Sequence, residues 1–131
     1  MSHTDPIADM LIRIKNAYLA NHTSLMVGYS RIKEDIAKVL KKEGYLQEVK
    51  VEGEGTQKQL NITLRYVEGV RALTDLRRLS KPGLRKYTSK SELPTVLSGL
   101  GHVVVSTPKG LMTARDAKKE NVGGELICEI W

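Results

Sequence analysis

The sequence of 131 residues lacks the features that mark secreted, membrane and zinc-binding proteins. Its single cysteine, Cys128, excludes an intramolecular disulfide, and no cysteine and histidine residues have the spacing of a zinc site. No uncharged apolar run approaches the roughly 18 residues that a membrane-spanning helix needs. The first residues have neither the basic start nor the apolar stretch of a signal peptide. These absences predict a soluble intracellular protein.

Aromatic residues are also scarce, with five tyrosines, one tryptophan and no phenylalanine. Leucine, isoleucine and valine must therefore fill the interior. With 40% apolar residues the chain can bury a modest core. Its length suits one large domain or two small ones, because domains usually have roughly 100–150 residues.

Residues that could carry out catalysis are few and scattered. No glycine-rich phosphate loop, dinucleotide fingerprint or nucleophile elbow is present. Cys128 lies in an apolar segment, which favours a buried thiol, and Asp5 and Asp9 stand where acids stabilise a helix start. We predict no enzyme activity, no metal and no cofactor; the alternative is a small enzyme that uses Asp5, Asp9 or Cys128 in a cleft.

The first half has the pattern of an α-β-α-β-β unit. Asp5 and Pro6 suit the N-cap and the first helical position, and apolar residues then recur at three- and four-residue intervals. Residues 60–66 alternate between apolar and polar, which is typical of a strand with one buried face. The predicted elements are a helix from Pro6, a strand at 25–29, a helix between Ser30 and Gly44, and strands at 46–51 and 60–66. We place this domain at residues 1–68.

The second half, residues 69–131, is predicted to be mainly β with short helices. Pro82-Gly83 indicates a type II turn, in which Gly83 has a positive φ. The final strand should place Leu126, Cys128 and Ile130 on one face. The predicted elements are strands at 73–80 and 84–88, a short helix at 91–99, strands at 102–107 and 111–112, a short helix that Thr113 and Asp116 begin, and a strand at 125–131. The fold class is α/β (α+β), with two small domains.

Positive charge is concentrated in the second half. The 21 basic and 15 acidic residues give a net charge of +6, of which residues 71–131 contribute +5. Such a surface attracts polyanions, and nucleic acid is the commonest one inside cells. The alternative is a solvated face that serves solubility alone. The cations that could attract nucleic acid are Arg77, Arg78, Lys81, Arg85, Lys86 and Lys90.

Two turns combine cations with glycine, at residues 81–85 and 106–110. Glycine lets a backbone approach a ligand closely, and lysine or arginine neutralises phosphate. The hydroxyls of Ser106 and Thr107 can bond to sugars and base edges, and the ring of Tyr87 can stack on an unpaired base. These features favour folded RNA over the major groove of DNA, although ordinary hairpin turns with solvated lysines would look similar.

Four stretches of the sequence resemble the bacterial family of small-subunit ribosomal proteins numbered eight. These stretches span nearly the whole chain: residues 5–16, 80–87, 99–112 and 123–125. The resemblance implies a two-domain protein of the cytoplasmic ribosome that binds the central domain of small-subunit ribosomal RNA and helps to assemble the platform. It also implies two protein neighbours, the small-subunit proteins numbered five and twelve. The alternative is a generic RNA-binding or protein-interaction module outside the ribosome, for which Trp131 and the last strand would form an exposed edge.

Carried over to this sequence, the family's RNA contacts fall in the second half and at the start of the first helix. The candidate RNA-binding residues are Ser106, Thr107, Lys109, Gly110, Tyr87, Lys86, Gly124, Glu125, Lys81, Arg85, Arg77, Arg78, Thr4 and Asp5. The family usually has Ser-Thr-Ser in the turn, whereas this chain has Pro108 at the third position. Proline lacks the hydroxyl and the backbone N–H that could donate to RNA.

Overall fold

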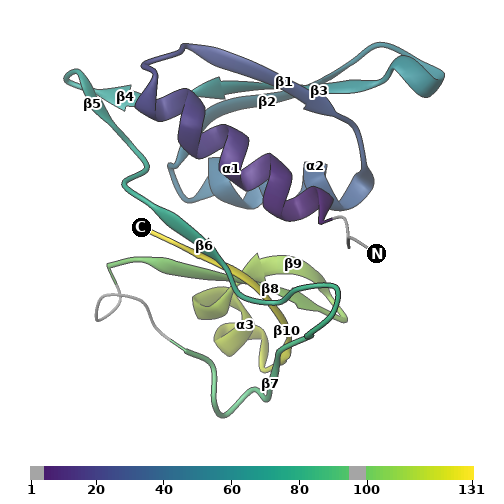
Figure 1. The fold of residues 1–131 in the computed structure, drawn as a ribbon. Helices are drawn as coiled ribbons and strands as arrows, with labels where there is room; N and C mark the ends of the chain where they lie inside the picture. Colours follow the sequence, from purple (N-terminus) through teal and green to yellow (C-terminus); the bar gives the residue numbers. More distant parts are fainter. Residues whose placement is uncertain (1–4, 95–99) are drawn as a thin grey trace. The chain divides into compact units, whose positions relative to one another are not determined.

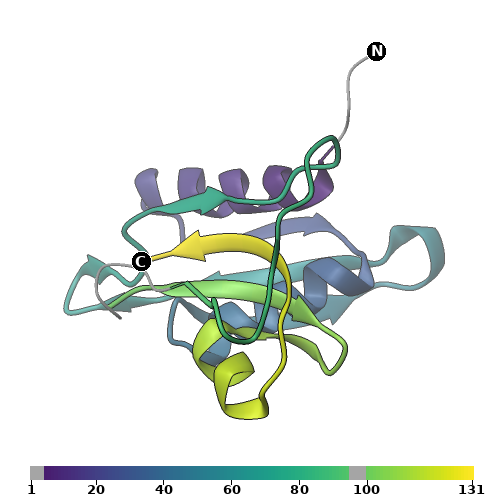
Figure 2. The ribbon, with the colours of Figure 1, turned by 90° about the horizontal axis from the view of Figure 1, so that it is seen from below.

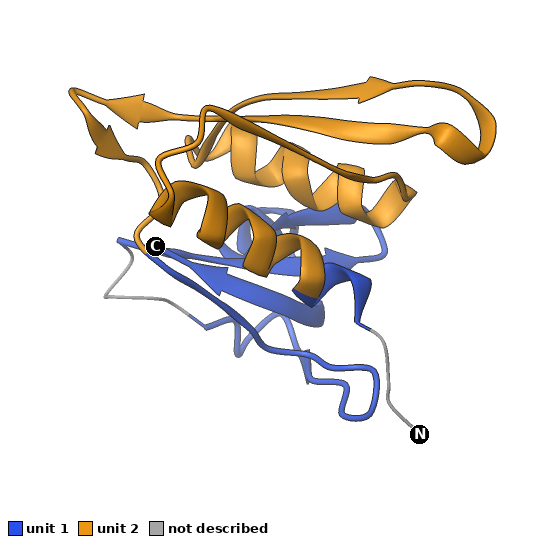
Figure 3. Ribbon diagram, turned by 45° about the horizontal axis from the view of Figure 1, so that its top comes forward, with its two compact units in different colours: residues 1–8, 75–131 blue, residues 9–74 orange. Residues whose placement is uncertain are grey.

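The chain forms two compact units in a computed structural model that describes residues 5–94 and 100–131. Unit 1 has residues 1–8 and 75–131, and unit 2 has residues 9–74 (Figure 3). The domain division drawn from the sequence falls six residues earlier, after residue 68. The division drawn from the sequence also places residues 1–8 in the N-terminal domain, whereas the structure groups them with residues 75–131. That residues 1–68 fold on their own stays a prediction.

The two helices of unit 2 begin as their sequences predict. Helix α1 spans Pro6–Leu19, and the N–H of Ala8 donates to Asp5 Oδ1 at 3.1 Å. Helix α2 spans Arg31–Lys42, and the N–H of Lys33 donates to the hydroxyl of its N-cap, Ser30, at 3.3 Å. Both bonds satisfy N–H groups that a helix start leaves unpaired. The predicted helices are thus confirmed.

Both helices of unit 2 lie on one face of its sheet (Figure 1). Three antiparallel strands form this sheet in the order β1-β3-β2: β1 (Ser24–Gly28), β2 (Leu46–Glu52) and β3 (Gln59–Leu64). The short helix η1 (Gly55–Gln57) lies between β2 and β3, and β4 (Tyr66–Val67) pairs with β5 (Val70–Arg71). Alternate residues of β3 are buried, as expected for a sheet covered on one face. The predicted hairpin is confirmed.

The sheet of unit 1 is built around its last strand. The strands are β6 (Leu76–Arg78), β7 (Tyr87–Thr88), β8 (His102–Thr107), β9 (Gly110–Thr113) and β10 (Gly124–Ile130). Both β6 and β7 pair with β10, β8 pairs with β10 as well, and β9 pairs with β8. Figure 2 shows β10, in yellow, between β6 and β8. The predicted strand at 102–107 is confirmed.

The hairpin expected from strands at 73–80 and 84–88 is wrong. The residues of β6 and β7 pair with different parts of β10 and not with each other. Strand β10 is long enough to pair with both segments. The turn between them is closed by hydrogen bonds between Lys81 and Leu84, 3.0 and 2.9 Å long. Gly83 does not have a positive φ, so the turn is not of type II.

A β-bulge in the last strand makes the predicted grouping of Leu126 with Cys128 on one face wrong. Leu126 lies opposite Val105, and Cys128 lies opposite Val104, so one extra residue, Ile127, is inserted in β10. Val104 and Val105 are neighbours in β8 and point to opposite faces. Leu126 therefore lies on the face opposite that of Cys128, and not with it as the sequence pattern predicted.

A small apolar cluster forms around one face of the unit 1 sheet. Val103, Val105 and Ala114 are buried, and Leu126 and Trp131 pack against them. Ala114 opens helix α3 (Ala114–Glu120), which contacts β8 and β9. The hydroxyl of Thr113 accepts the N–H of Asp116 at 3.2 Å, as the sequence predicted. The helix expected at 91–99 falls largely outside the described residues.

Candidate nucleic-acid interface

A row of side chains crosses the sheet of unit 1 from β7 to β9. Tyr87 is the register partner of Glu125, Glu125 is the partner of Ser106, and Ser106 is the partner of Leu111. Residues directly opposite in antiparallel strands share a face, with Cβ atoms about 4.5–5.5 Å apart. Tyr87, Glu125 and Ser106 therefore lie side by side, although up to 38 residues separate them along the chain.

Two side chains of this row, those of Tyr87 and Ser106, are open to a ligand. The side chain of Tyr87 is 69% exposed, which leaves its ring free to stack. Ser106 is half-buried, and within residues 5–94 and 100–131 its hydroxyl has no hydrogen-bond partner. The pairing of an exposed ring with an uncommitted hydroxyl suits a ligand that offers both a flat face and polar edges.

Glycine at position 124 allows the strands of the row to come together. A Cβ atom there would lie 2.8 Å from the carbonyl carbon of Ser106 and 3.1 Å from the Cα of Thr107. Such approaches are closer than a side chain tolerates, so only glycine fits without moving β8 away from β10. Gly124 therefore shapes the interface through the backbone and offers no side-chain contact.

The turn between β8 and β9 holds itself closed. The hydroxyl of Thr107 donates to the carbonyl of Gly110 at 2.8 Å and accepts the N–H of Lys109 at 3.1 Å. Gly110 has φ +110°, which favours glycine. Lys109 is exposed and pairs loosely with Glu120 at 3.3 Å. Pro108 is exposed at the turn, so its missing donors do not disturb this closure.

A buried hydroxyl lies beneath the basic loop, which we define as residues 80–86. Ser80 has no exposed surface. Its Oγ donates to Glu125 Oε2 at 2.7 Å and accepts the N–H of Lys86 at 2.8 Å. Arg85 Nη1 lies 3.2 Å from both carboxylate oxygens of Glu125. Sequence reasoning did not select Ser80, which is a small polar residue at the end of a predicted strand.

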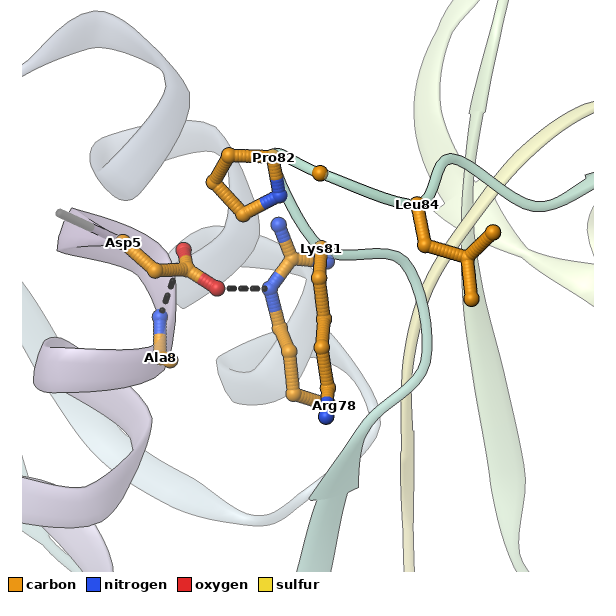
Figure 4. Close-up of a pocket in the computed structure, with 7 residues that line it drawn as sticks. Asp5, Ala8, Arg78, Lys81, Pro82 and Leu84 are labelled. Carbon is orange, nitrogen blue, oxygen red and sulfur yellow. Dashed lines mark hydrogen bonds and ion pairs between the residues drawn. The ribbon is translucent and has the colours of Figure 1, made fainter. Parts of the chain in front are cut away.

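The three arginine candidates and Asp5 all form ion pairs within unit 1. Arg78 forms an ion pair with Asp5 at 3.1 Å, and its side chain is only 13% exposed (Figure 4). It also donates to the carbonyl of Ile127 at 2.7 Å. Arg77 forms an ion pair with Glu129. Arg78 and Asp5 thus hold the start of α1 to β6, and little of either remains for a ligand.

A hollow of about 410 Å³ lies beside the Asp5–Arg78 pair. The start of α1 and the tip of the basic loop line it, and Figure 4 shows their side chains. The lining residues are Asp5, Ala8, Arg78, Lys81, Pro82, Gly83 and Leu84. Most of this lining is apolar, so it does not extend the cationic surface.

Three lysines carry the charge that remains uncompensated near the row. In the part of the chain that the structure describes, no carboxylate pairs with Lys81, Lys86 or Lys90. All three are exposed. Arg85 is exposed as well, but Glu125 compensates it. Of the positive charge that the sequence concentrates at residues 77–90, the part without a carboxylate partner is therefore carried by these three lysines.

Of the three residues proposed for a rival catalytic function, Cys128 is buried and Asp5 is paired, while Asp9 is exposed on α1. Cys128 is fully buried, and burial raises the pKa of its thiol to about 12, so it stays protonated at neutral pH. Asp5 caps α1 and pairs with Arg78. Within the described residues, no group of three metal-ligating side chains occurs.

The exposed edge imagined for a protein-interaction module is also contradicted. Strand β10 pairs with β8 on one side and with β6 and β7 on the other, so it is the interior strand of its sheet. Trp131 exchanges backbone hydrogen bonds with Asp75, both 3.1 Å long. Thr4, the remaining candidate contact, lies outside the described residues. No helix in the described ranges has the length and apolar character to cross a membrane.

Comparison with known proteins identifies relatives over the whole length of the chain. The family model described as ribosomal protein S8 matches residues 5–131. Small ribosomal subunit protein uS8 of Mycoplasmopsis pulmonis is 51% identical over 98% of this chain and 97% of its own. The protein of the same name from Dictyoglomus thermophilum is 48% identical over 100% of both chains. That from Burkholderia cenocepacia is 48% identical over 99% of both.

Proposed function

This chain belongs to the ribosomal protein S8 family, and on that premise we propose that it is a structural constituent of the small ribosomal subunit. In this role it binds the central domain of small-subunit ribosomal RNA directly and helps to assemble the platform. Its place of action is the ribosome in the cytoplasm. Its neighbours there include the small-subunit proteins numbered five and twelve.

The observation that carries the proposal is the row formed by Tyr87, Glu125 and Ser106. An exposed ring and an uncommitted hydroxyl on one face of a rigid sheet suit unpaired bases and sugar hydroxyls. A regular duplex would offer a ring of this kind nothing to stack on. The row therefore supports recognition of an irregular RNA segment.

The unpaired lysines supply a second, less selective attraction. Each lysine that neutralises a phosphate releases a counterion, so binding weakens as salt rises. Lys81 and Lys86 belong to the basic loop, and Lys90 follows Tyr87 by three residues in the chain. In this proposal the lysines bring RNA to the surface, and the row selects the shape that fits. No catalytic step takes part.

The test is a filter-binding titration of the full chain with a transcript of the central domain, at several salt concentrations. Tyr87→Ala should lose about 1–3 kcal/mol of specific affinity, while Tyr87→Phe should keep most of it, because stacking needs the ring and not the hydroxyl. Lys86→Ala should weaken binding to specific and random RNA alike and reduce the salt slope by about one.

The matched control is Lys119→Ala, which removes the same charge from an exposed residue of α3 outside the candidate interface. It should leave the specific affinity close to that of the unaltered protein. Equal binding to the central-domain transcript and to unrelated structured RNA would overturn the ribosomal assignment and favour a generic RNA-binding module.

A further inference from the structure

Glu125 is an unexpected residue for the middle of a surface that binds phosphates. A carboxylate repels RNA, yet Glu125 is the register partner of both Tyr87 and Ser106. Its side chain is only 14% exposed, so it is partly withdrawn from any ligand. Its charge must therefore serve something within unit 1.

The partners of Glu125 show what it holds. One carboxylate oxygen accepts the hydroxyl of Ser80 at 2.7 Å, and both oxygens lie 3.2 Å from Arg85 Nη1. Ser80 and Arg85 stand at the start and near the end of the basic loop. A single carboxylate on β10 thus fixes two points of a loop that comes from another part of the chain.

The buried hydroxyl of Ser80 completes this network of hydrogen bonds between the basic loop and β10. Its hydroxyl accepts the N–H of Lys86 while it donates to Glu125, so one buried oxygen joins the two ends of the loop to the sheet. The carbonyl of Lys86 accepts the N–H of Leu126 at 2.8 Å, which continues the attachment along β10. A fully buried hydroxyl with two good partners is costly to replace, because removing it leaves both unsatisfied.

We propose that Ser80 and Glu125 are positioning residues of the RNA-binding surface. They hold the basic loop, with Lys81 and Lys86, at the same surface as Tyr87 and Ser106, and neither residue itself contacts RNA. This inference rests on the proposed function. It changes the role of Glu125 from a contact, as the family resemblance implied, to a support that acts through the loop.

The test uses Ser80 and Thr113 as a matched pair, since both are buried polar side chains among the described residues of unit 1. Ser80→Ala frees the basic loop, whereas Thr113→Ala removes the N-cap of α3 and leaves the loop untouched. Both full-length variants are titrated with the central-domain transcript across a salt series, at a temperature where circular dichroism shows each one folded.

Ser80→Ala should weaken binding about tenfold to a hundredfold and flatten the salt slope by about one to two, because each lost phosphate contact removes roughly 0.9 from that slope. Thr113→Ala should lower thermal stability and leave the slope unchanged. If Ser80→Ala keeps the slope and affinity of Thr113→Ala, the hydroxyl is only structural and the inference is overturned.

Glu125→Gln decides the question if Ser80→Ala does not fold. It keeps the size of the side chain and an acceptor for Ser80, but it loses the ion pair with Arg85. A carboxylate that merely lay near RNA would repel it, so its removal would tighten binding. The positioning role predicts weaker binding instead, and tighter binding would refute it. An unaltered protein that fails to prefer the central-domain transcript would refute the proposed function itself.

Discussion

Unit 1 has ten basic and seven acidic residues and unit 2 has eleven and eight, so each unit has a net charge of +3. In unit 2, Glu34 lies 3.0 Å from Lys38, Glu48 lies 2.6 Å from Lys41, and Asp35 lies 3.6 Å from Arg31. In unit 1, acidic residues pair mainly with arginines, as Asp5 does with Arg78. Net charge alone therefore does not distinguish the unit that carries the candidate interface.

The difference follows from the two side chains. Arginine presents a flat fork of donors that suits a fixed pair with a carboxylate, whereas lysine is a compact charge on a flexible stem. Unit 1 uses Arg77, Arg78 and Arg85 to hold its own segments together and leaves the loop lysines to solvent. The arrangement of pairs, and not the amount of charge, indicates where a polyanion can bind.

The largest effect should come from Gly124→Ala in unit 1. The new methyl group would meet the backbone of Ser106 and force β8 from β10, at a cost of about 3 kcal/mol, the upper end for overpacking. Urea unfolding measures the loss. Gly28→Ala in β1 is the control, because nothing lies within 4 Å of its Cβ position. Equal losses from the two substitutions would refute the close approach.

A smaller effect is expected from Tyr18→Phe in unit 2. The buried hydroxyl of Tyr18 donates to the carbonyl of Tyr45 and accepts the N–H of Arg65 at 3.0 Å. Its removal leaves two backbone groups unsatisfied and should cost about 1–3 kcal/mol of unfolding free energy.

RNA affinity measured on the folded Tyr18→Phe variant should be unchanged, since no candidate contact of unit 1 is altered. Tyr29→Phe provides the comparison, because the hydroxyl of Tyr29 donates to a side chain, Glu34 Oε1 at 3.0 Å, from a half-buried position, and its loss leaves no backbone group unsatisfied. Its effect on stability should be slight. A loss of RNA affinity in Tyr18→Phe would break the separation of roles between the two units.

The last effect is absent at neutral pH and concerns Cys128 in unit 1 under alkaline conditions. Burial raises the pKa of its thiol from 9.0 to about 12. The folded state then keeps a proton that the unfolded state releases, so this contribution to stability is complete below pH 9 and is lost as pH rises toward 12. The free energy of unfolding should fall by roughly 1.4 kcal/mol per pH unit in that range because of this group.

The measurement is a set of urea unfolding curves between pH 8 and pH 10.5. Cys128→Ala should be less stable at every pH, but its stability should decline less steeply above pH 9 than that of the unaltered protein. Identical slopes for the two proteins would show that the thiol titrates normally and is not enclosed.

Sequence reasoning predicted unit 2 more completely than unit 1, and the reason is the range of the interactions involved. The cap at Ser30 and the alternation in β3 are local signals within unit 2, and each was confirmed. The bulge at Ile127 and the attachment of β7 to β10 depend on partners more than 20 residues away. No pattern of neighbouring residues contains that information.

The candidate interface shows the same division. Ser106 and Tyr87 could be chosen from their chemistry and from the family resemblance, and the structure brings them into one row. Their contact with RNA stays a prediction. The role of Ser80 could not be foreseen, because its carboxylate partner lies 45 residues further along the chain. Arg78 was chosen for its charge, and only the structure shows that Asp5 compensates it.

The interior position of β10 has a consequence for folding during synthesis on the ribosome. This strand follows β6, β7 and β8 in the chain and pairs with all three, so β6 and β7 lack their sheet partner, and β8 can pair only with β9, until residues 124–130 have been synthesised. Unit 2 has every one of its strands by residue 71 and can condense while translation continues. A growing chain can therefore fold unit 2 early, whereas the candidate interface of unit 1 forms only after nearly the whole chain has been synthesised.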